Sequence, residues 1–216
     1  MARLPKKPAP RPKAERYHHG DLPRAMLSEA LRTIQRRGID SLTLRSVGEK
    51  LGVSRTALYR HFANKEALLG AVAAEGFRRL RQELFEAWDQ GGRGRAGFEA
   101  MGAAYIHFAV RHPSHYRVMF GGALAKGDAT LPPQDKSADA FGVLVDALVE
   151  LQGAGLAVSQ DAHLLALFVW SVVHGVAMLA LDGVLHRPED TETLSRFAIE
   201  RLWSGIGVGM PAEAVK

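Results

Sequence analysis

Five polar residues between positions 55 and 61 would share one side of a short helix, and each can donate a hydrogen bond. They are Arg55, Thr56, Tyr59, Arg60 and His61, and no acidic residue interrupts them. Guanidinium groups bind phosphates and pair with the O6 and N7 atoms of guanine, and hydroxyl groups contact phosphates and base edges. This face therefore favours contact with the major groove of double-stranded DNA over catalysis.

Two short helices joined by a glycine turn are expected to hold this face. Leu44, Val47 and Leu51 follow the i, i+3, i+7 spacing of a helix with one buried side. Gly52 is suited to the end of that helix, and Ser54 can cap the next one. The inward side of the second helix is predicted to contain Leu58 and Phe62. The pattern predicts a helix-turn-helix.

Longer helices are expected on both sides of this pair. Asp21 can cap a helix over residues 22–37, and Gly38 would end it. The buried stripe of this helix is predicted to be Leu27, Ala30, Leu31 and Ile34. Asn64 can cap a helix that runs to about Trp88.

The stretch from Asp21 to about Arg81 resembles the DNA-binding domain of the TetR family of transcriptional regulators. The matching pieces are Gly52-Val53-Ser54, Leu58-Tyr59, His61-Phe62 and Lys65-Glu66-Ala67-Leu68-Leu69. Two departures stand out. Gly48 replaces the usual alanine at a tight contact between helices, and Arg55-Thr56-Ala57 replaces a start of the recognition helix that usually contains glycine. The second departure means that the bases recognised cannot be taken from relatives.

The resemblance implies a DNA-binding site around residues 43–63. Arg45, Arg55, Thr56 and Tyr59 are expected to reach base edges, and Tyr59 is also a candidate for phosphate contact. The whole predicted site comprises Thr43, Arg45, Ser54, Arg55, Thr56, Tyr59, Arg60, His61 and Lys65, of which Arg60, His61 and Lys65 are assigned to phosphates.

Charge is unevenly distributed along the 216 residues. The net charge is +5, but residues 1–62 hold 14 Lys and Arg against 5 Asp and Glu, and the remainder is net acidic. A basic N-terminal part on a mildly acidic remainder indicates that the first part binds a polyanion. Residues 1–19 are basic and proline-rich, lack the apolar segment of a secretory signal and are expected to be a disordered arm. The sequence has no cysteine, which excludes disulfides and thiolate metal sites and suits the cytoplasm.

The rest of the chain reads as further helices. They are expected over residues 98–111, 114–120, 138–151, 162–185 and 188–206, and no segment shows useful strand alternation. The glycine-rich residues 91–97 should form a break between two helices. They lack the Gly-Lys-Ser/Thr ending of a phosphate-binding loop. The predicted fold is all-α, with the arm (1–19), an N-terminal three-helix helix-turn-helix domain (20–81) and a C-terminal helical domain for effector binding and dimerisation (82–216).

Residues 164–181 are apolar apart from Ser171 and His174, a length that reaches the membrane-spanning threshold. The central His and Gly, the flanking Asp161 and Asp182, and the lack of a nearby Lys/Arg cluster argue against a membrane span. A helix that is apolar all round is equally suited to a core or an oligomer interface. We expect no membrane contact, and a homodimer that uses this helix and the last one.

Two short motifs resemble a class of TetR-type C-terminal domains with a Trp/His-Gly signature. They are Trp170 with His174-Gly175, and His115 through Phe120. Most aromatic and sulfur side chains of these helices are expected to be ordinary core. The resemblance also implies a cavity for a small-molecule effector among them. The candidate ligand-binding residues are Met101, Tyr105, His107, Phe108, Met119, Phe120, Trp170, His174 and Met178.

His107, His112 and His115 suggest a metal site, but Pro113 interrupts any helix that would align them, and no carboxylate set accompanies them. They are expected to be surface or capping histidines, and His174 a core histidine. No catalytic set stands out.

The sequence therefore predicts a cytoplasmic, dimeric, ligand-responsive regulator of transcription. In this family such a protein is most often a repressor. The expected partners are a palindromic DNA operator and a small effector, and no cofactor is expected. The alternatives are a DNA-binding regulator without an effector, an all-α enzyme and a membrane-anchored regulator.

Overall fold

The computed structural model describes residues 21–121 and 139–208. Every regular element in these two segments is a helix, which confirms the predicted all-α fold, and one isolated antiparallel bridge joins Ala157 to Gly207. The predicted basic arm, residues 1–19, lies outside the described residues.

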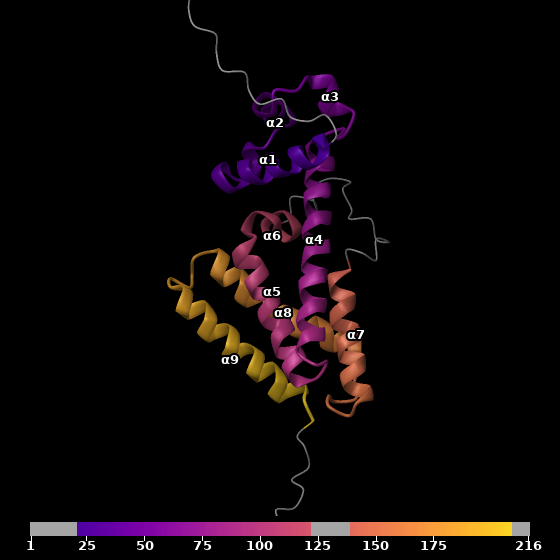
Figure 1. Ribbon diagram of the computed structural model, residues 1–216. Helices are drawn as coiled ribbons and strands as arrows, with labels where there is room; N and C mark the ends of the chain where they lie inside the picture. Colours follow the sequence, from indigo (N-terminus) through magenta and orange to yellow (C-terminus); the bar gives the residue numbers. More distant parts are fainter. Residues whose placement is uncertain (1–20, 122–138, 209–216) are drawn as a thin grey trace, which may run out of the picture. The chain divides into compact units, whose positions relative to one another are not determined.

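Packing divides the chain into two compact units, residues 1–65 and 66–216, whose described parts we call the head and the body. The head contains α1 (Leu22–Arg37), the short 3-10 helix η1 (Ile39–Ser41), α2 (Leu44–Leu51) and α3 (Arg55–Tyr59) (Figure 1). The helices of the second part are α4 (Lys65–Gln90), α5 (Arg95–Arg111), α6 (Pro113–Phe120), α7 (Ala140–Gly153), α8 (Ala162–Leu181) and α9 (Pro188–Ile206).

The helix α4 belongs to the body by its packing. It is continuous across residue 81, where the sequence suggested a domain boundary, and the contacts place the division at its first residue. The rings of Phe77 on α4 and Phe120 on α6 meet edge to face with centroids 5.4 Å apart. Gly76 lies directly against Met119, also on α6.

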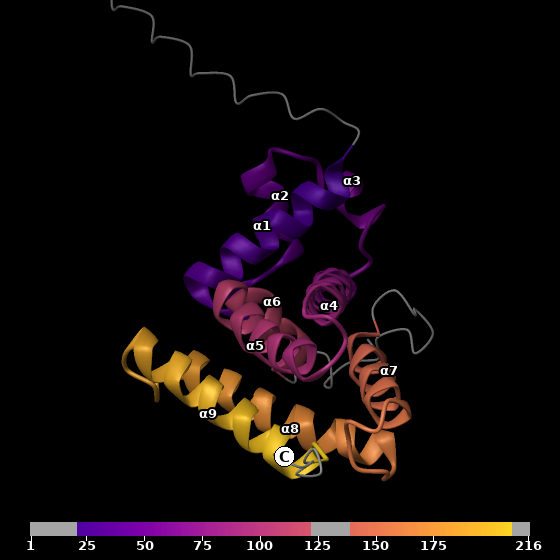
Figure 2. The same ribbon diagram turned by 60° about the horizontal axis from the view of Figure 1, so that its bottom comes forward.

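The core of the body forms around α5, which contacts α6, α8 and α9. Figure 2 shows α8 and α9 running side by side, and α7 packs against α8. Phe108, Tyr116, Leu148 and Ile206 are among the fully buried side chains, so the core draws on four different helices.

The first helix starts at the predicted residue but without the predicted cap. The Asp21 side chain makes no capping hydrogen bond, and its carboxylate lies 3.8 Å from Arg24 Nη1. A cap accepts from the N–H of the second or third helical residue, and the second is Pro23, which has none. The proline therefore removes one of the two donors that the cap would use.

The buried stripe of α1 is also rotated from the predicted one. Ala30 and Ile34 are buried as predicted, whereas Leu27 and Leu31 are only half-buried. The other buried positions are Ala25, Met26, Glu29 and Thr33. Two of these are polar, so a prediction from apolar spacing alone could not find this face.

A buried ionic network explains the rotation. Glu29 is 7% exposed. Its Oε1 lies 2.8 Å from Lys50 Nζ on α2, and its Oε2 lies 3.0 Å from Arg32 Nε. Lys50 Nζ also donates to Thr33 Oγ1 at 3.2 Å. Burial alone would raise the pKa of the Glu29 carboxyl, but the hydrogen bond and charge of Lys50, helped by Arg32 and Thr33, lower this pKa below its usual value. The network ties α2 to α1.

Replacing Glu29 with Gln should destabilise the head at neutral pH by about 1.5–3 kcal/mol, because the group that pairs with Lys50 and Arg32 loses its negative charge. Since the folded-state pKa of Glu29 is lowered, its contribution is complete above the unfolded pKa and is lost as pH falls through the folded pKa. Urea unfolding followed by circular dichroism, at pH 7 and again in the acidic range, should show the two proteins converging as pH falls. Asp40→Asn, at an exposed site, is the matched control, and an equal loss in both variants would contradict the prediction.

Candidate DNA-binding surface and a polar cluster in the body

Both helices of the predicted helix-turn-helix begin with a side-chain cap. Thr43 Oγ1 accepts from the backbone N–H of Ser46 at 3.0 Å, and Ser46 Oγ accepts in return from the Thr43 N–H at 3.3 Å. Ser54 Oγ accepts from the Ala57 N–H at 3.3 Å. These bonds satisfy donors that a helix start leaves unpaired. Thr43 and Ser54 therefore have structural roles in addition to their predicted place in the DNA site.

The turn between α2 and α3 depends on two glycines. A Cβ atom built on Gly48 would lie 2.3 Å from Leu58 Cδ1, so the two helices meet here without a side chain between them. Gly52 ends α2 with φ of 66°, a left-handed conformation that side-chain-bearing residues rarely adopt. Gly48, the departure from the family pattern, lies at the tight contact expected from the sequence.

The predicted donor face of α3 is exposed. Arg55, Thr56, Tyr59, Arg60 and His61 are all exposed, whereas Leu58 is buried and Phe62 half-buried. The regular helix ends at Tyr59, and the next residues continue as a turn in which the His61 N–H donates to the Leu58 carbonyl at 3.0 Å. The guanidinium of Arg55 lies over the Tyr59 ring, 5.4 Å from its centroid, so the two residues support each other.

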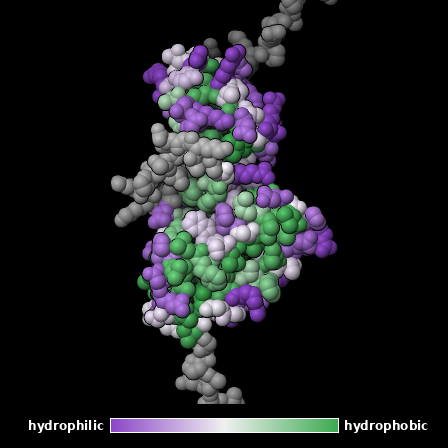
Figure 3. Space-filling view, turned by 180° about the vertical axis from the view of Figure 1, so that it is seen from behind, coloured by the Kyte–Doolittle hydropathy of each residue, from purple (hydrophilic) through white to green (hydrophobic). Residues whose placement is uncertain are grey.

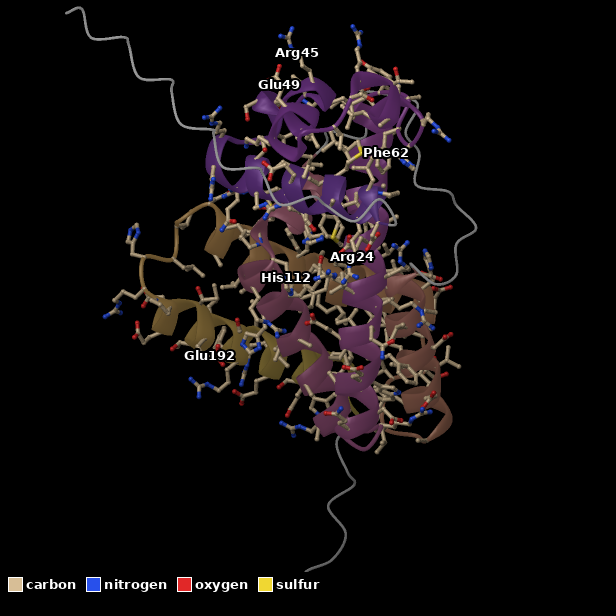
Figure 4. All side chains as sticks on the ribbon, turned by 45° about the horizontal axis from the view of Figure 1, so that its top comes forward. Arg24, Arg45, Glu49, Phe62, His112 and Glu192 are labelled. Carbon is tan, nitrogen blue, oxygen red and sulfur yellow. The ribbon has the colours of Figure 1, made fainter. Side chains whose placement is uncertain are left out.

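The two remaining predicted DNA contacts lie at different places in the head. Arg45 on α2 is exposed and binds Glu49 one turn later, as Figure 4 shows for the labelled pair. Lys65 is half-buried, and its Nζ lies 3.5 Å from the Asp40 carbonyl oxygen. A phosphate contact by Lys65 would therefore compete with this backbone carbonyl.

In the body, four of the predicted or neighbouring residues form one polar cluster. The Tyr105 and Tyr116 hydroxyls lie 3.1 Å apart, and they lie 2.9 and 2.7 Å from His174 Nδ1. Trp170 Nε1 donates to the Tyr105 hydroxyl at 2.7 Å. Both tyrosine hydroxyls therefore converge on Nδ1 of the imidazole. The polar cluster thus joins α5, α6 and α8.

The polar cluster is held neutral. Burial raises the pKa of Tyr105 to about 12 and also raises that of Tyr116. Burial lowers the pKa of His174. Neutral groups that donate and accept within an apolar surrounding recognise a mainly apolar compound better than an ion.

Aromatic rings surround the polar cluster. Phe120 lies 4.9 Å from the His174 ring and 6.0 Å from the Trp170 ring, and Phe141 lies against Trp170 at 5.0 Å with the two rings tilted by 34°, all distances being between centroids. Of the other predicted ligand residues, Met101, Phe108 and Met119 are buried and Met178 is half-buried.

His107 does not join the polar cluster, because it lies two residues from Tyr105 on the same helix and so on a different side. Its Nε2 lies 3.2 Å from Glu192 on α9, a residue labelled in Figure 4.

Sequence reasoning missed three residues in or near the polar cluster. Tyr116 lies within the motif from His115 to Phe120, so the motif pointed to it without giving it a role. Phe77 and Phe141 carried no motif, and only the fold places their rings beside Phe120 and Trp170.

Two of the three histidines lie together: His112, between α5 and α6, meets His115 edge to face with ring centroids 5.9 Å apart. His112 Nε2 lies 3.7 Å from Glu83, and His115 Nε2 lies 3.8 Å from Glu75. The prediction that all three are surface or capping residues is wrong for His115, which is 5% exposed. Burial lowers the pKa of His115 to about 4, so the residue is neutral at physiological pH. Among residues 21–121 and 139–208, no group of three or more ligating side chains is arranged to hold a metal ion.

Two family models match the chain in succession. Residues 26–72 match the model of bacterial regulatory proteins of the tetR family, and residues 98–202 match the tetracyclin repressor-like C-terminal domain. The second match does not specify a Trp/His-Gly class, so that assignment stays a prediction.

Two known proteins are similar over most of the chain, and a third is similar over about a quarter of it. An uncharacterised HTH-type transcriptional regulator of Mycobacterium tuberculosis is 29% identical over 84% of this chain and 80% of its own. A solved structure of a Rhodococcus sp. RHA1 protein of unknown function is 32% identical and has a TM-score of 0.77, covering 90% of this chain and 100% of that one. The class A tetracycline repressor protein of Escherichia coli is 47% identical over 51 residues, 24% of each chain.

Proposed function

The chain belongs to the TetR family of transcriptional regulators, and we propose that it binds a palindromic operator as a homodimer whose affinity for DNA changes when a small molecule binds the body. It is a DNA-binding protein rather than an enzyme. We propose that it acts in the cytoplasm and represses transcription. The observation that carries this function is the exposed donor face of α3, held by two capped helices and a glycine contact.

Base recognition is assigned to three exposed residues of α3, Arg55, Thr56 and Tyr59, together with Arg45 on α2. A recognition helix lies in the major groove with its first residues against base edges, and Arg55 and Thr56 open α3. Arg60, His61 and Lys65 are assigned to phosphates. In a dimer, two such helices would enter successive major grooves about 34–36 Å apart.

Replacing Arg55 with Ala should relax the preference at one base pair of each half-site by about 1–3 kcal/mol, because a guanine contact is lost. Replacing Lys65 with Ala should weaken binding to all DNA sequences alike and reduce the slope of log affinity against log salt concentration by about 1. Selection from random oligonucleotides, followed by affinity measurements at several salt concentrations, separates the two effects. A wild-type protein without a preferred site would contradict the proposed function.

We assign the proposed effector site to the polar cluster of Tyr105, Tyr116, Trp170 and His174. This cluster combines neutral hydrogen-bonding groups with aromatic rings and joins three helices of the body. The favoured ligand is a mainly apolar compound with one or two polar groups. A coupling of about 1–3 kcal/mol between ligand and DNA is typical of allosteric proteins and would be enough for regulation.

A bound effector should raise the melting temperature with its concentration and shift the operator affinity in the same samples, because it stabilises the state that binds it. Tyr116→Phe should weaken both effects, and His107→Ala, outside the polar cluster, should leave both intact. A thermal-shift screen read out by operator binding makes the measurement. If no compound changes both quantities, the regulator without an effector is the better description.

A dimer interface is assigned to α8 and α9. Leu164, Leu167, Phe168 and Leu179 on α8 and Phe197 on α9 are large apolar residues that are at least 40% exposed. Figure 3 shows hydrophobic side chains gathered on one face of the body. The described helix α8 is long and apolar enough to span a membrane by length and composition. We favour a dimer, because the exposed residues continue from α8 onto the charged, amphipathic α9.

Only part of the surface of α8 and α9 is free to contribute to this proposed interface. Ala177 on α8 and Ala198 and Leu202 on α9 are buried in their own body, whereas Phe197 and Arg201 are exposed. The guanidinium of Arg201 lies over the Phe197 ring at 5.6 Å. Gly175 has open space where a Cβ atom would lie, so it remains suited to close approach by a second chain.

Phe197→Glu should convert the dimer to monomer and abolish operator binding while leaving the head folded, because the interface would lose an aromatic ring and would have to remove a carboxylate from water. Val149→Glu introduces the same charge at a similarly exposed apolar residue of α7 and is the control. Light scattering at micromolar concentration reports the mass. A monomeric wild-type protein would remove both the interface and the palindromic site from the proposal.

A further inference from the structure

Arg45 and Glu49 lie one turn apart on α2, the helix that precedes the recognition helix, and Figure 4 shows them at the outer edge of the head. Arg45 Nε donates to Glu49 Oε1 at 2.8 Å. The Arg45 side chain is 89% exposed and that of Glu49 is 63% exposed. A pair exposed to this degree adds little to folding stability.

The geometry of the pair leaves the outer edge of the guanidinium open. The carboxylate binds Nε, which is nearest the chain, and the two terminal nitrogens hold the four N–H groups that form the fork of an arginine. A bidentate contact with guanine O6 and N7 uses this fork. Glu49 therefore restrains the Arg45 side chain without occupying the atoms that would contact a base.

An acidic residue on a DNA-binding surface carries a cost, because it repels the phosphate backbone. If Arg45 served only to attract phosphates, Glu49 would lower the affinity for every DNA sequence by the same factor. A carboxylate that holds the guanidinium in one orientation has a different effect, since a side chain fixed before binding loses less freedom on meeting its base. The two roles differ in whether one base pair is affected or all of them.

We propose that Glu49 is a positioning residue that orients Arg45 for a bidentate contact with one guanine in each operator half-site. This proposal rests on the proposed function, because it requires α2 of the head to face DNA. It adds a determinant of specificity outside α3, in a residue that does not itself touch the base.

The test compares two substitutions at position 49 with one at position 45. Random-oligonucleotide selection with wild type and Arg45→Ala first identifies the base pair whose preference depends on Arg45. Glu49→Ala should weaken the preference at that same base pair by about 3- to 10-fold and leave the other positions unchanged. Glu49→Gln, whose amide oxygen still accepts from Nε, should retain more of the preference. Asp40→Ala removes an exposed negative charge elsewhere in the head and is the control for charge alone.

If Glu49→Ala and Glu49→Gln both raise the affinity for every sequence equally and leave the base preference unchanged, the positioning role is overturned. Glu49 would then act only by repelling phosphates. An Arg45→Ala protein with the wild-type preference at every base pair would overturn it as well. In both cases a selective wild-type protein leaves the proposed function standing, whereas a wild type without any preferred sequence defeats the function itself. Circular dichroism melting of each variant confirms that the head is folded.

Discussion

The candidate DNA-binding surface depends on how closely α2 approaches α3. At the contact, Leu58 fills the space that a Cβ atom on Gly48 would need, and the buried leucine turns the opposite side of α3 outwards. The left-handed Gly52 sets the angle at which the chain enters α3. The network of Glu29, Lys50 and Thr33 then fixes α2 on α1. The exposed arginines thus stand on a small frame in which an apolar contact and a buried ion pair act together.

The body uses a different principle. Its helices are mainly apolar, and the hydroxyls of Tyr105 and Tyr116, the indole N–H of Trp170 and the imidazole of His174 satisfy one another inside it. Hydrogen bonds among these side chains depend on orientation, so they specify how the three helices pack more closely than apolar contacts alone do. An effector at the proposed site would have to exchange these hydrogen bonds for its own, and the exchange would act on all three helices.

Much of the fold could be predicted from the sequence, because helix ends carry local signals. The bounds of α1 and α9 agree with the prediction, α2 ends before Gly52 as predicted, and Ser54 caps α3. The errors arise where a residue's burial depends on a partner that is distant in the sequence. Glu29 is buried only because Lys50 comes from another helix, and His115 is buried because α4 covers it with Gly76. The predicted DNA contacts follow from one helix face, whereas the meeting of Tyr105, Tyr116 and His174 required three helices to be placed.

The positions of the aromatic residues have a spectroscopic consequence. The three tryptophans of the sequence are Trp88, Trp170 and Trp203, and all of them belong to the body. The indole N–H of Trp170 is bonded to Tyr105 within the polar cluster, while Trp203 lies against Phe98 with ring centroids 5.6 Å apart. Intrinsic tryptophan fluorescence therefore reports on the body alone. Its emission would follow changes around Trp170, and unfolding of the head alone would leave the emission unchanged.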